Sequence, residues 1–328
     1  MRLCPTRVAM VAAVFLFALQ LSAQNPNNPI QIALLRWYPA NTVAQLSPCT
    51  EPEGMAFDGS HIWVACSGAN ELQEFNASDG ALVRTVTGLD GPTALAYDGA
   101  NIWVVNYAGN SVAEVNASSG VINPAGPFPV QSEPSGIAFD GTNIWVTNYG
   151  SNSISQVVAT TGAVTNHALS GCSTPYGVAF ESFDGLNLWV ACHDSNVVAE
   201  VSTSTGGVLQ TVPVGQGPLS VVYDGETGET NGPFVWVTNS GGGTVSKISL
   251  TTFTAPPGFS AGSEPYGMVF DGLFIWVTNP GVGTVTKLYQ SNGATAGTFT
   301  PGATPFFMGF DGGNVYVSNH GGGTISKM

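Results

Sequence analysis

The stretch EPSGIAFDGTNIWVTNYGSNSISQVVATTG, residues 133–162, decides the fold, because most of the chain after residue 52 repeats it. Successive repeats open on a proline, and these prolines are 40 to 47 residues apart. They are Pro52, Pro92, Pro134, Pro175, Pro218, Pro265 and Pro305. A period near 40 with about four strands in each unit is typical of a β-propeller blade. The sequence therefore predicts an all-β, seven-bladed β-propeller with four-stranded blades.

Turn residues divide the quoted unit into strands. Residues 136–140 form the first expected strand, which ends at the hairpin dipeptide Asp140-Gly141. Residues 143–148 and 153–158 form the second and third, and Thr161-Gly162 turns the chain into the fourth. The first two strands are almost unbroken apolar runs, as expected where both faces of a sheet are covered. In a propeller, the neighbouring blades provide that cover.

Large aromatic residues recur at one position of the second strand in every unit. They are Trp63, Trp103, Trp145, Trp189, Trp236, Trp276 and Tyr316. An aspartate recurs in the turn before that strand, at Asp58, Asp98, Asp140, Asp184, Asp224, Asp271 and Asp311. Each indole can bury roughly 150–250 Å². Residues that recur in every blade are expected to pack blade against blade and not to bind a ligand.

The seventh unit, residues 305–328, stops in its third strand. Residues 41–52 resemble residues 162–175, which lead into another blade. We therefore expect residues 42–47 to pair with the C-terminal strand and complete blade 7, which removes an open sheet edge. On this interpretation the propeller spans residues 41–328, preceded by a lead-in segment at residues 24–40.

Residues 1–23 are interpreted as a secretory signal peptide. Arg2 and Arg7 flank the start of an apolar run over residues 8–19, and Leu21-Ser22-Ala23 provides a small-residue cleavage site. An uncleaved anchor is the alternative. No later run approaches the roughly 20 apolar residues of a membrane span. The sequence thus predicts an exported protein, either periplasmic, cell-surface or secreted.

The charge balance bears on the class of partner. The chain has a formal net charge of −14, which becomes −16 when the signal segment and its two arginines are removed. Proteins hold phosphate backbones chiefly with Lys and Arg, so nucleic acid is excluded as a partner. A cationic partner is compatible with this charge, as is a simple contribution to solubility.

Four cysteines remain after the signal segment, and spacing alone permits three pairings. Blades 1 and 4 carry Cys66 and Cys192 at the end of the second strand, and only these blades carry a cysteine in the entering loop, at Cys49 and Cys172. This joint substitution predicts disulfides Cys49–Cys66 and Cys172–Cys192, with metal ligation as the alternative. The other blades carry asparagine at the strand end, and we expect it to hydrogen-bond the entering loop: Asn106, Asn148, Asn239, Asn279 and Asn319.

Candidate ligand-binding residues are those that vary between blades on the face where the entering loops and the loops after the second strand open, here called the top face. They are Glu51, Glu53, Tyr107, Glu133, Tyr149, Tyr176, His193, Glu264, Tyr266, Phe306 and His320. Acidic and aromatic groups around a funnel are suited to stacking on a sugar or holding a cation. The alternative is that they are ordinary solvated loop residues.

The repeat resembles the YVTN-type β-propeller proteins, whose name is echoed by WVTN at residues 145–148, 236–239 and 276–279 and by YVSN at residues 316–319. The similarity covers about residues 41–328. It implies an exported propeller, and the motif contains no catalytic residue to carry over. It also implies no cofactor.

A second resemblance is to virginiamycin B lyases and the gluconolactonase group, propellers that act on small molecules with a top-face metal. A lyase needs a cluster of His and acidic residues. His193 and His320 belong to blades 4 and 7, and we expect them to lie across the ring without sharing one ion. The lyase repeat also favours Phe-Thr-Glu where this chain has Val-Thr-Asn.

The sequence therefore predicts a monomeric propeller that acts as a binding or scaffolding module through its top face, with a protein, peptide or glycan as partner and no catalysis. The alternatives are a metal-dependent small-molecule lyase or lactonase, and a purely structural surface protein.

Overall fold

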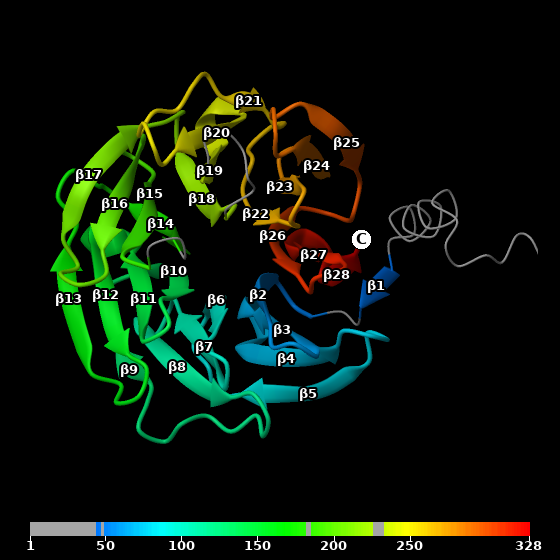
Figure 1. Cartoon of the computed structure of the whole chain (residues 1–328). Helices are drawn as coiled ribbons and strands as arrows, with labels where there is room; N and C mark the ends of the chain where they lie inside the picture. The colour runs from blue at the N-terminus through cyan, green and yellow to red at the C-terminus, as the bar shows by residue number, and fades with distance from the viewer. Residues whose placement is uncertain (1–43, 47–48, 182–184, 226–232) are drawn as a thin grey trace, which may run out of the picture. The chain divides into compact units, whose positions relative to one another are not determined.

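The computed structural model describes residues 44–46, 49–181, 185–225 and 233–328. The signal peptide and lead-in segment predicted for residues 1–40 lie outside the described residues and remain predictions. Residues Ala44–Lys327 form one compact unit, built from seven four-stranded antiparallel sheets. These sheets follow one another around a ring (Figure 1). The predicted seven-bladed β-propeller is confirmed.

The strands of the first four blades have the following bounds. Blade 1 contains β2 Pro52–Phe57, β3 His61–Cys66, β4 Glu71–Asn76 and β5 Leu82–Thr87. Blade 2 contains β6 Pro92–Tyr97, β7 Asn101–Asn106, β8 Ser111–Asn116 and β9 Phe128–Pro129. Blade 3 contains β10 Pro134–Phe139, β11 Asn143–Asn148, β12 Ser153–Val158 and β13 Val164–Ala168. Blade 4 contains β14 Pro175–Glu181, β15 Asn187–Cys192, β16 Val197–Ser202 and β17 Val208–Pro213.

The last three blades complete the ring. Blade 5 contains β18 Pro218–Tyr223, β19 Phe234–Asn239, β20 Thr244–Ser249 and β21 Phe259–Ser260. Blade 6 contains β22 Met268–Phe270, β23 Phe274–Asn279, β24 Thr284–Tyr289 and β25 Thr295–Phe299. Blade 7 contains β26 Pro305–Phe310, β27 Val315–Asn319, β28 Thr324–Lys327 and β1 Ala44–Leu46.

The ring closes as the sequence predicts. Strand β1 pairs antiparallel with β28, and Leu46 lies opposite Ile325 in the register. The fourth strand of blade 7 thus comes from the N-terminal side of the propeller. Its described bounds, Ala44–Leu46, fall inside the predicted 42–47, of which residues 42, 43 and 47 lie outside the described residues.

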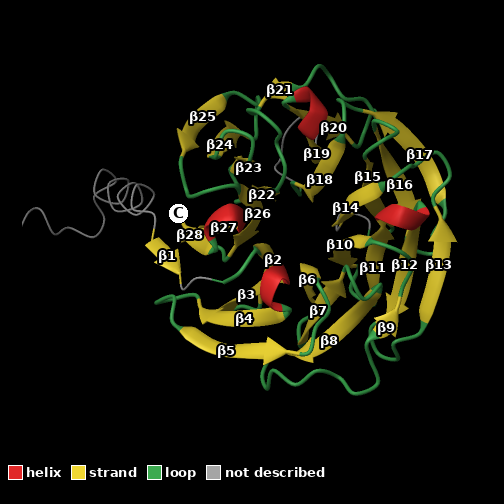
Figure 2. Ribbon diagram, turned by 180° about the vertical axis from the view of Figure 1, so that it is seen from behind, coloured by secondary structure: helices red, strands yellow, loops and turns green. Residues whose placement is uncertain are grey.

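Short 3-10 helices follow the second strand in blades 1, 3, 5 and 7, at Ser67–Ala69, Tyr149–Ser151, Ser240–Gly242 and His320–Gly322. Figure 2 shows them in red on the face turned toward the viewer. Because they belong to the loops after the second strand, that face is the top face. His320 and Tyr149 are the first residues of two of these helices.

The recurrent aromatic residues are buried, with at most 4% of their surface exposed. Each indole N–H also donates to a carboxylate at the end of the first strand. In five blades the acceptor is the turn aspartate, at 2.7–2.9 Å, namely Asp58, Asp98, Asp140, Asp224 and Asp271. In blade 4 the acceptor of Trp189 is Glu181 at 2.8 Å. Asp184, predicted for that turn, lies outside the described residues.

The two predicted disulfides are present. Cys49 is bonded to Cys66 with Cα atoms 5.9 Å apart, and Cys172 to Cys192 with Cα atoms 5.0 Å apart. Each joins the entering loop of a blade to the end of its second strand. The chain-entropy model assigns roughly 3 kcal/mol to a closed loop of this length.

The prediction that the asparagines at the end of the second strand hydrogen-bond the entering loop is wrong for four of the five. Asn106 alone of the five bonds the entering loop, where its Oδ1 accepts the Asp90 N–H at 3.3 Å. The other four donate from Nδ2 to hydroxyls of the third strand: Asn148, Asn239, Asn279 and Asn319. In blade 6 the hydroxyl then donates onward, from Thr286 to the Ala261 carbonyl at 2.6 Å. A Ser or Thr of the third strand therefore stands between asparagine and loop.

Within the part of the chain that the structure describes, no helix has the length and apolar character needed to cross a membrane.

Candidate functional site

Each blade contributes the residue that follows its opening proline to one cavity of about 510 Å³ on the top face, here called the funnel. These seven residues are Glu53, Thr93, Ser135, Tyr176, Leu219, Tyr266 and Phe306. In six blades the pairing of first and second strands shifts register directly after the proline. Such a bulge re-aims a side chain. One variable residue per blade thus faces the ligand-accessible end of the channel.

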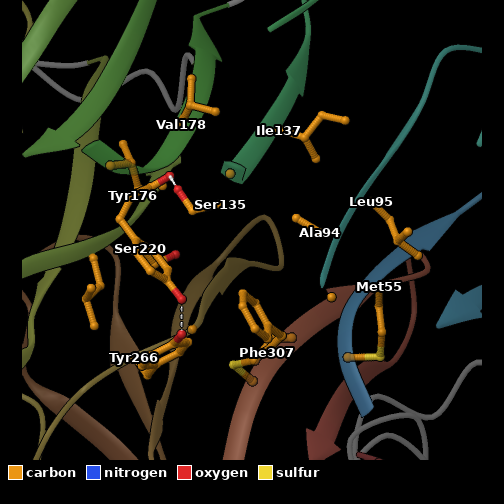
Figure 3. A pocket seen from close by; sticks show the side chains of 17 residues that line it. Met55, Ala94, Leu95, Ser135, Ile137, Tyr176, Val178, Ser220, Tyr266 and Phe307 are labelled. Atoms are coloured by element: carbon orange, nitrogen blue, oxygen red, sulfur yellow. Dashed lines mark hydrogen bonds between the residues drawn. The ribbon is translucent and has the colours of Figure 1, made fainter. Parts of the chain in front are cut away.

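The next residue along the first strand is glycine in four blades, because the first strands approach one another closely there. A Cβ atom would lie 2.2–2.5 Å from a carbonyl oxygen of the following blade at Gly54, Gly136, Gly177 and Gly267. Below this level is a smaller cavity of about 140 Å³, lined by the first strands. Figure 3 shows its lining, with Tyr176 and Tyr266 joined by a hydrogen bond.

A continuous set of rings lines one side of the funnel and is called the aromatic wall: Tyr149, Tyr176, Tyr266, Phe306 and His320. Tyr266 stacks on Phe306 with ring centroids 4.7 Å apart and an interplanar angle of 13°. Phe306 in turn stacks on His320 at 4.8 Å. Tyr176 meets Tyr149 and Tyr266 edge-on, at 6.2 and 5.9 Å. Offset and edge-to-face pairs of this kind add about 0.5–1.5 kcal/mol each to the burial of the rings.

The hydroxyls of Tyr176 and Tyr266 hydrogen-bond each other at the boundary between the two cavities. Burial raises the pKa of Tyr176 to about 12. Burial, followed by the interaction with Tyr176, also raises the pKa of Tyr266. Both phenols are therefore neutral at physiological pH, and one of the two protons remains available to a ligand.

The threonine of the WVTN motif holds the aromatic residues in place. The Oγ1 of Thr238 donates to the carbonyl of Tyr266 at 2.9 Å, and that of Thr278 donates to the carbonyl of Phe306 at 2.5 Å. Thr147 makes the same bond to Tyr176. These three threonines are fully buried. The three blades that contain WVTN are thus the ones that precede a blade with an aromatic residue directly after its opening proline.

Glu53 lies at the end of the aromatic wall. Its side chain is 14% exposed, and its Oε1 is 3.3 Å from the Nε2 of His320. The Ser67 hydroxyl donates to the same oxygen at 3.5 Å. Burial, supported by the charge of Glu51, raises the pKa of Glu53 to about 7. The carboxyl group therefore exchanges a proton near neutral pH.

Nine of the eleven sequence-predicted candidates line the funnel: Glu51, Glu53, Tyr107, Tyr149, Tyr176, His193, Tyr266, Phe306 and His320. The other two, Glu133 and Glu264, are exposed residues of the entering loops outside the lining. Burial raises the pKa of Tyr107, and the charge of the nearby Glu133 raises it further.

Sequence reasoning missed several lining residues, namely Thr93, Ser135, Leu219 and Phe307. Three of them occupy the position after the opening proline, so the repeat itself contained the signal. Threonine, serine and leucine side chains at this position do not by themselves indicate a binding site. The role of the WVTN threonines was missed because their acceptors are backbone carbonyls of the next blade.

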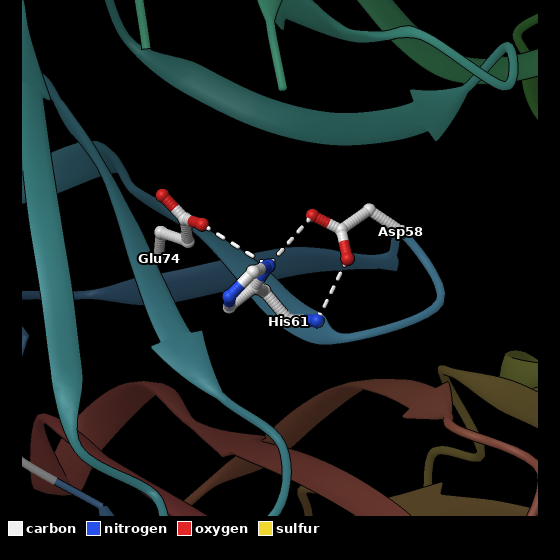
Figure 4. Close-up of side chains that lie close together, drawn as sticks. All are labelled: Asp58, His61 and Glu74. Carbon is white, nitrogen blue, oxygen red and sulfur yellow. Dashed lines mark hydrogen bonds and ion pairs between the residues drawn. The ribbon is translucent and has the colours of Figure 1, made fainter. Parts of the chain in front are cut away.

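One cluster of metal-ligand type occurs among the described residues, at the end of blade 1 opposite the funnel. Figure 4 shows His61 Nδ1 between Asp58 Oδ2 and Glu74 Oε1, at 3.1 and 3.2 Å. Asp58 also accepts the Trp63 indole N–H, and Arg84 contacts Glu74 at 2.5 Å. These contacts join the cluster to other residues of blade 1. Among the described residues, the carboxylates and imidazoles that line the funnel form no such group.

The fold and the funnel define the class of protein as a seven-bladed β-propeller with a ligand-sized top-face cavity. Neither a protein-family model nor a curated protein sequence matches the chain. The resemblance to YVTN-type repeats beyond the fold therefore remains a prediction.

Solved structures of the same architecture are numerous. A streptogramin B lyase is 17% identical, covers 87% of this chain and 96% of its own, and has a TM-score of 0.73. The virginiamycin B lyase of Staphylococcus aureus is 19% identical, covers 87% of this chain and 98% of its own, and has the same TM-score. The hydrazine synthase of Kuenenia stuttgartiensis is 17% identical, covers 86% of this chain and 96% of its own, also at 0.73. At these identities the likeness shows the fold alone.

Proposed function

We propose that this protein is an exported binding module whose funnel holds a small organic molecule, or the end of a peptide or glycan, by stacking it against the aromatic wall. The observation that carries the proposal is the convergence of the aromatic wall on one cavity of about 510 Å³. Ligand sites are typically concave, about 300–1,000 Å³ in volume, and lined by aromatic side chains with a few polar groups.

Export is part of the proposal. Two disulfides are typical of a protein that matures in an oxidising compartment. The predicted signal peptide also supports export.

The test is a screen of the purified protein for thermal stabilisation by aromatic amines, short peptides and sugars. A ligand that binds the folded state raises the free energy of unfolding by mass action, by about 2.7 kcal/mol when the free ligand is at a hundred times its Kd, and so raises the unfolding midpoint. Phe306→Ala should abolish the shift, because it removes the ring between Tyr266 and His320. Tyr289→Ala, which removes an aromatic ring that is 45% exposed and lies outside the funnel lining, is the matched control and should leave the shift intact. A ligand shift that survives Phe306→Ala would contradict the proposed site.

A second candidate function rests on Glu53 and His320. A carboxyl group with a pKa of about 7, 3.3 Å from an imidazole, is suited to take a proton from a bound molecule. This supports the lyase alternative as a proton-transfer enzyme. Mass spectrometry of ligands recovered after incubation tests it: turnover that is lost in Glu53→Gln would establish catalysis, and unchanged ligands would leave binding as the function.

A further inference from the structure

The funnel is rich in negative and π-electron groups and has no Lys or Arg in its lining. Glu51 and Glu53 contribute carboxyl groups, and the aromatic wall presents ring faces with negative electrostatic potential. The imidazoles of His193 and His320 are the basic groups of the lining. The funnel lining therefore contains no permanent positive charge to balance these groups.

The permanent cations of the described residues are engaged elsewhere. Arg84 contacts Glu74 across strands β4 and β5 of blade 1. Lys247 donates to the Gln290 carbonyl at 2.9 Å, and Lys287 lies over the Phe274 ring at 3.8 Å from its centroid. Lys327 donates to the Ala77 carbonyl at 2.6 Å. None of these four residues belongs to the funnel lining.

Glu53 is a largely covered carboxyl group with few polar partners: its side chain is 14% exposed. A carboxylate can accept about four hydrogen bonds, whereas the polar neighbours of Glu53 are the Ser67 hydroxyl at 3.5 Å and the His320 imidazole at 3.3 Å. Its neighbour His320 stacks on Phe306, which places Glu53 at the end of the aromatic wall. A cation at this point would meet a carboxylate and ring faces together.

We propose that the ligand of the funnel carries an organic cation, an alkylated or protonated amine, seated beside the carboxylate of Glu53 and against the rings of the aromatic wall. This inference rests on the proposed function and names its ligand class. Cations bind to aromatic faces within about 6 Å of the ring centroid, and the attraction grows when water is excluded. A phosphate or carboxylate ligand would meet Glu51 and Glu53 without a permanent cation to receive it.

Cation binding by Glu53 is linked to the loss of a proton. The groups that face Glu53 are Glu51, His320, Tyr176 and Tyr266. Because the free carboxyl group has a pKa of about 7, part of the protein is protonated there at pH 6.5. A bound cation favours the carboxylate, so affinity should rise with pH between pH 5 and about 7 and then level off.

The experiment compares choline with its uncharged isostere 3,3-dimethylbutan-1-ol, using calorimetric titration of the full-length protein at pH 5 and pH 8. Choline should bind at least about tenfold more tightly than the isostere at pH 8, the size expected of a desolvated cation–π contact with a charge partner. The preference should shrink at pH 5. Binding of choline at pH 6.5 should also release protons. Titrations in two buffers of different ionisation enthalpy measure this release.

Two variants separate a specific site from a general attraction to an acidic protein. Glu53→Gln should reduce the preference for choline to about twofold or less while the isostere binds as before, provided that its circular dichroism matches the wild type. Glu264→Gln removes an exposed carboxylate of the same face and should keep the preference. Equal binding of choline and the isostere would overturn the cation inference and leave the binding function standing. If both these probes and uncharged aromatic ligands fail to bind, the proposed function fails as well.

Discussion

The two sides of the funnel are built from the same repeat position and have opposite chemistry. Blades 4, 6 and 7 place Tyr176, Tyr266 and Phe306 after their opening prolines, whereas blades 1, 2 and 3 place Glu53, Thr93 and Ser135 there. The rings contact one another in sequence, while Glu53 meets the wall only through His320. A symmetric scaffold thus presents an asymmetric surface.

The difference between the two sides of the funnel has a basis in the buried residues beneath them. Wherever a blade places an aromatic residue directly after its opening proline, the preceding blade carries a threonine that holds the carbonyl of that residue. The blades that precede the polar residues have Ser318, Ala65 and Val105 at this position. The lesson is that a motif resembling pure scaffold also positions the variable residues of the next blade.

Removing a ring from the aromatic wall should have the largest effect. Tyr266→Ala deletes the residue that contacts both Tyr176 and Phe306. We expect a loss of about 3 kcal/mol in the free energy of unfolding, since large-to-small changes at buried aromatic residues cost about 3–5 kcal/mol and Tyr266 is only partly covered. Urea denaturation measures it. Tyr107→Ala, which removes a ring that is 43% exposed at the same cavity, should cost less than about 0.5 kcal/mol. Equal losses would mean that the wall is not a packed unit.

Neutralising the acidic side should stabilise the protein in one pH range only. The folded-state pKa of Glu53, about 7, lies above its ordinary value of 4.5, so the folded state holds the proton more tightly than the unfolded state. This contribution to stability is present below pH 4.5 and is lost as the pH rises through 7.

Glu53→Gln should therefore raise the free energy of unfolding at pH 8 by about 1–3 kcal/mol relative to the wild type, from 1.36 kcal/mol per pKa unit. At pH 4.5 the two proteins should be alike. Urea denaturation at both pH values gives the comparison, and a variant that is equally stabilised at pH 4.5 would refute the electrostatic reason.

Removing the hydroxyl beneath the wall should have a smaller effect. Thr278→Val keeps the shape of the buried side chain and deletes its hydrogen bond to the Phe306 carbonyl. A loss of about 1–2 kcal/mol is expected, because the carbonyl partner is left with one hydrogen bond fewer. Near-ultraviolet circular dichroism should also change as the stacked rings loosen. Thr278→Ser retains the hydroxyl and should preserve that spectrum; a spectrum unaltered in Thr278→Val would argue against a positioning role.

The exposed acids outside the lining should have the smallest effect. Glu264→Gln removes one charge in an exposed loop, where substitutions usually change the free energy of unfolding by less than about 0.5 kcal/mol. Thermal unfolding at low and moderate salt measures the change. A loss above 1 kcal/mol would show that Glu264 belongs to the packed part of the top face.

Much of the architecture was predictable because it repeats. The proline spacing predicted seven blades, and the incomplete seventh unit predicted the closure now seen between β1 and β28. The joint substitution of cysteines in blades 1 and 4 predicted both disulfides, because residues that change together in the same repeat occupy neighbouring positions. The candidates after the prolines also came together, since equivalent positions of every blade face the same channel.

Contacts between non-equivalent positions of the repeat were harder to predict from the sequence. The asparagine prediction failed because the amide donates to a hydroxyl of the third strand, a contact that the repeat pattern did not indicate. In blade 4 the indole of Trp189 donates to Glu181. This choice of acceptor depends on the direction of the indole N–H, and a repeat period of about 40 residues gives no information on that direction.

By itself, the sequence determined the number of blades, the strand order, the closing strand, the two disulfides and the ring of positions that face the channel. Those features follow from periodicity, because one local pattern repeated at a fixed interval permits one arrangement of neighbours. Only the tertiary structure decided which ring stacks on which, that Glu53 is buried beside His320, and that each WVTN threonine serves the following blade. These facts depend on distances between side chains and backbone of different blades, which arise only when the ring is closed.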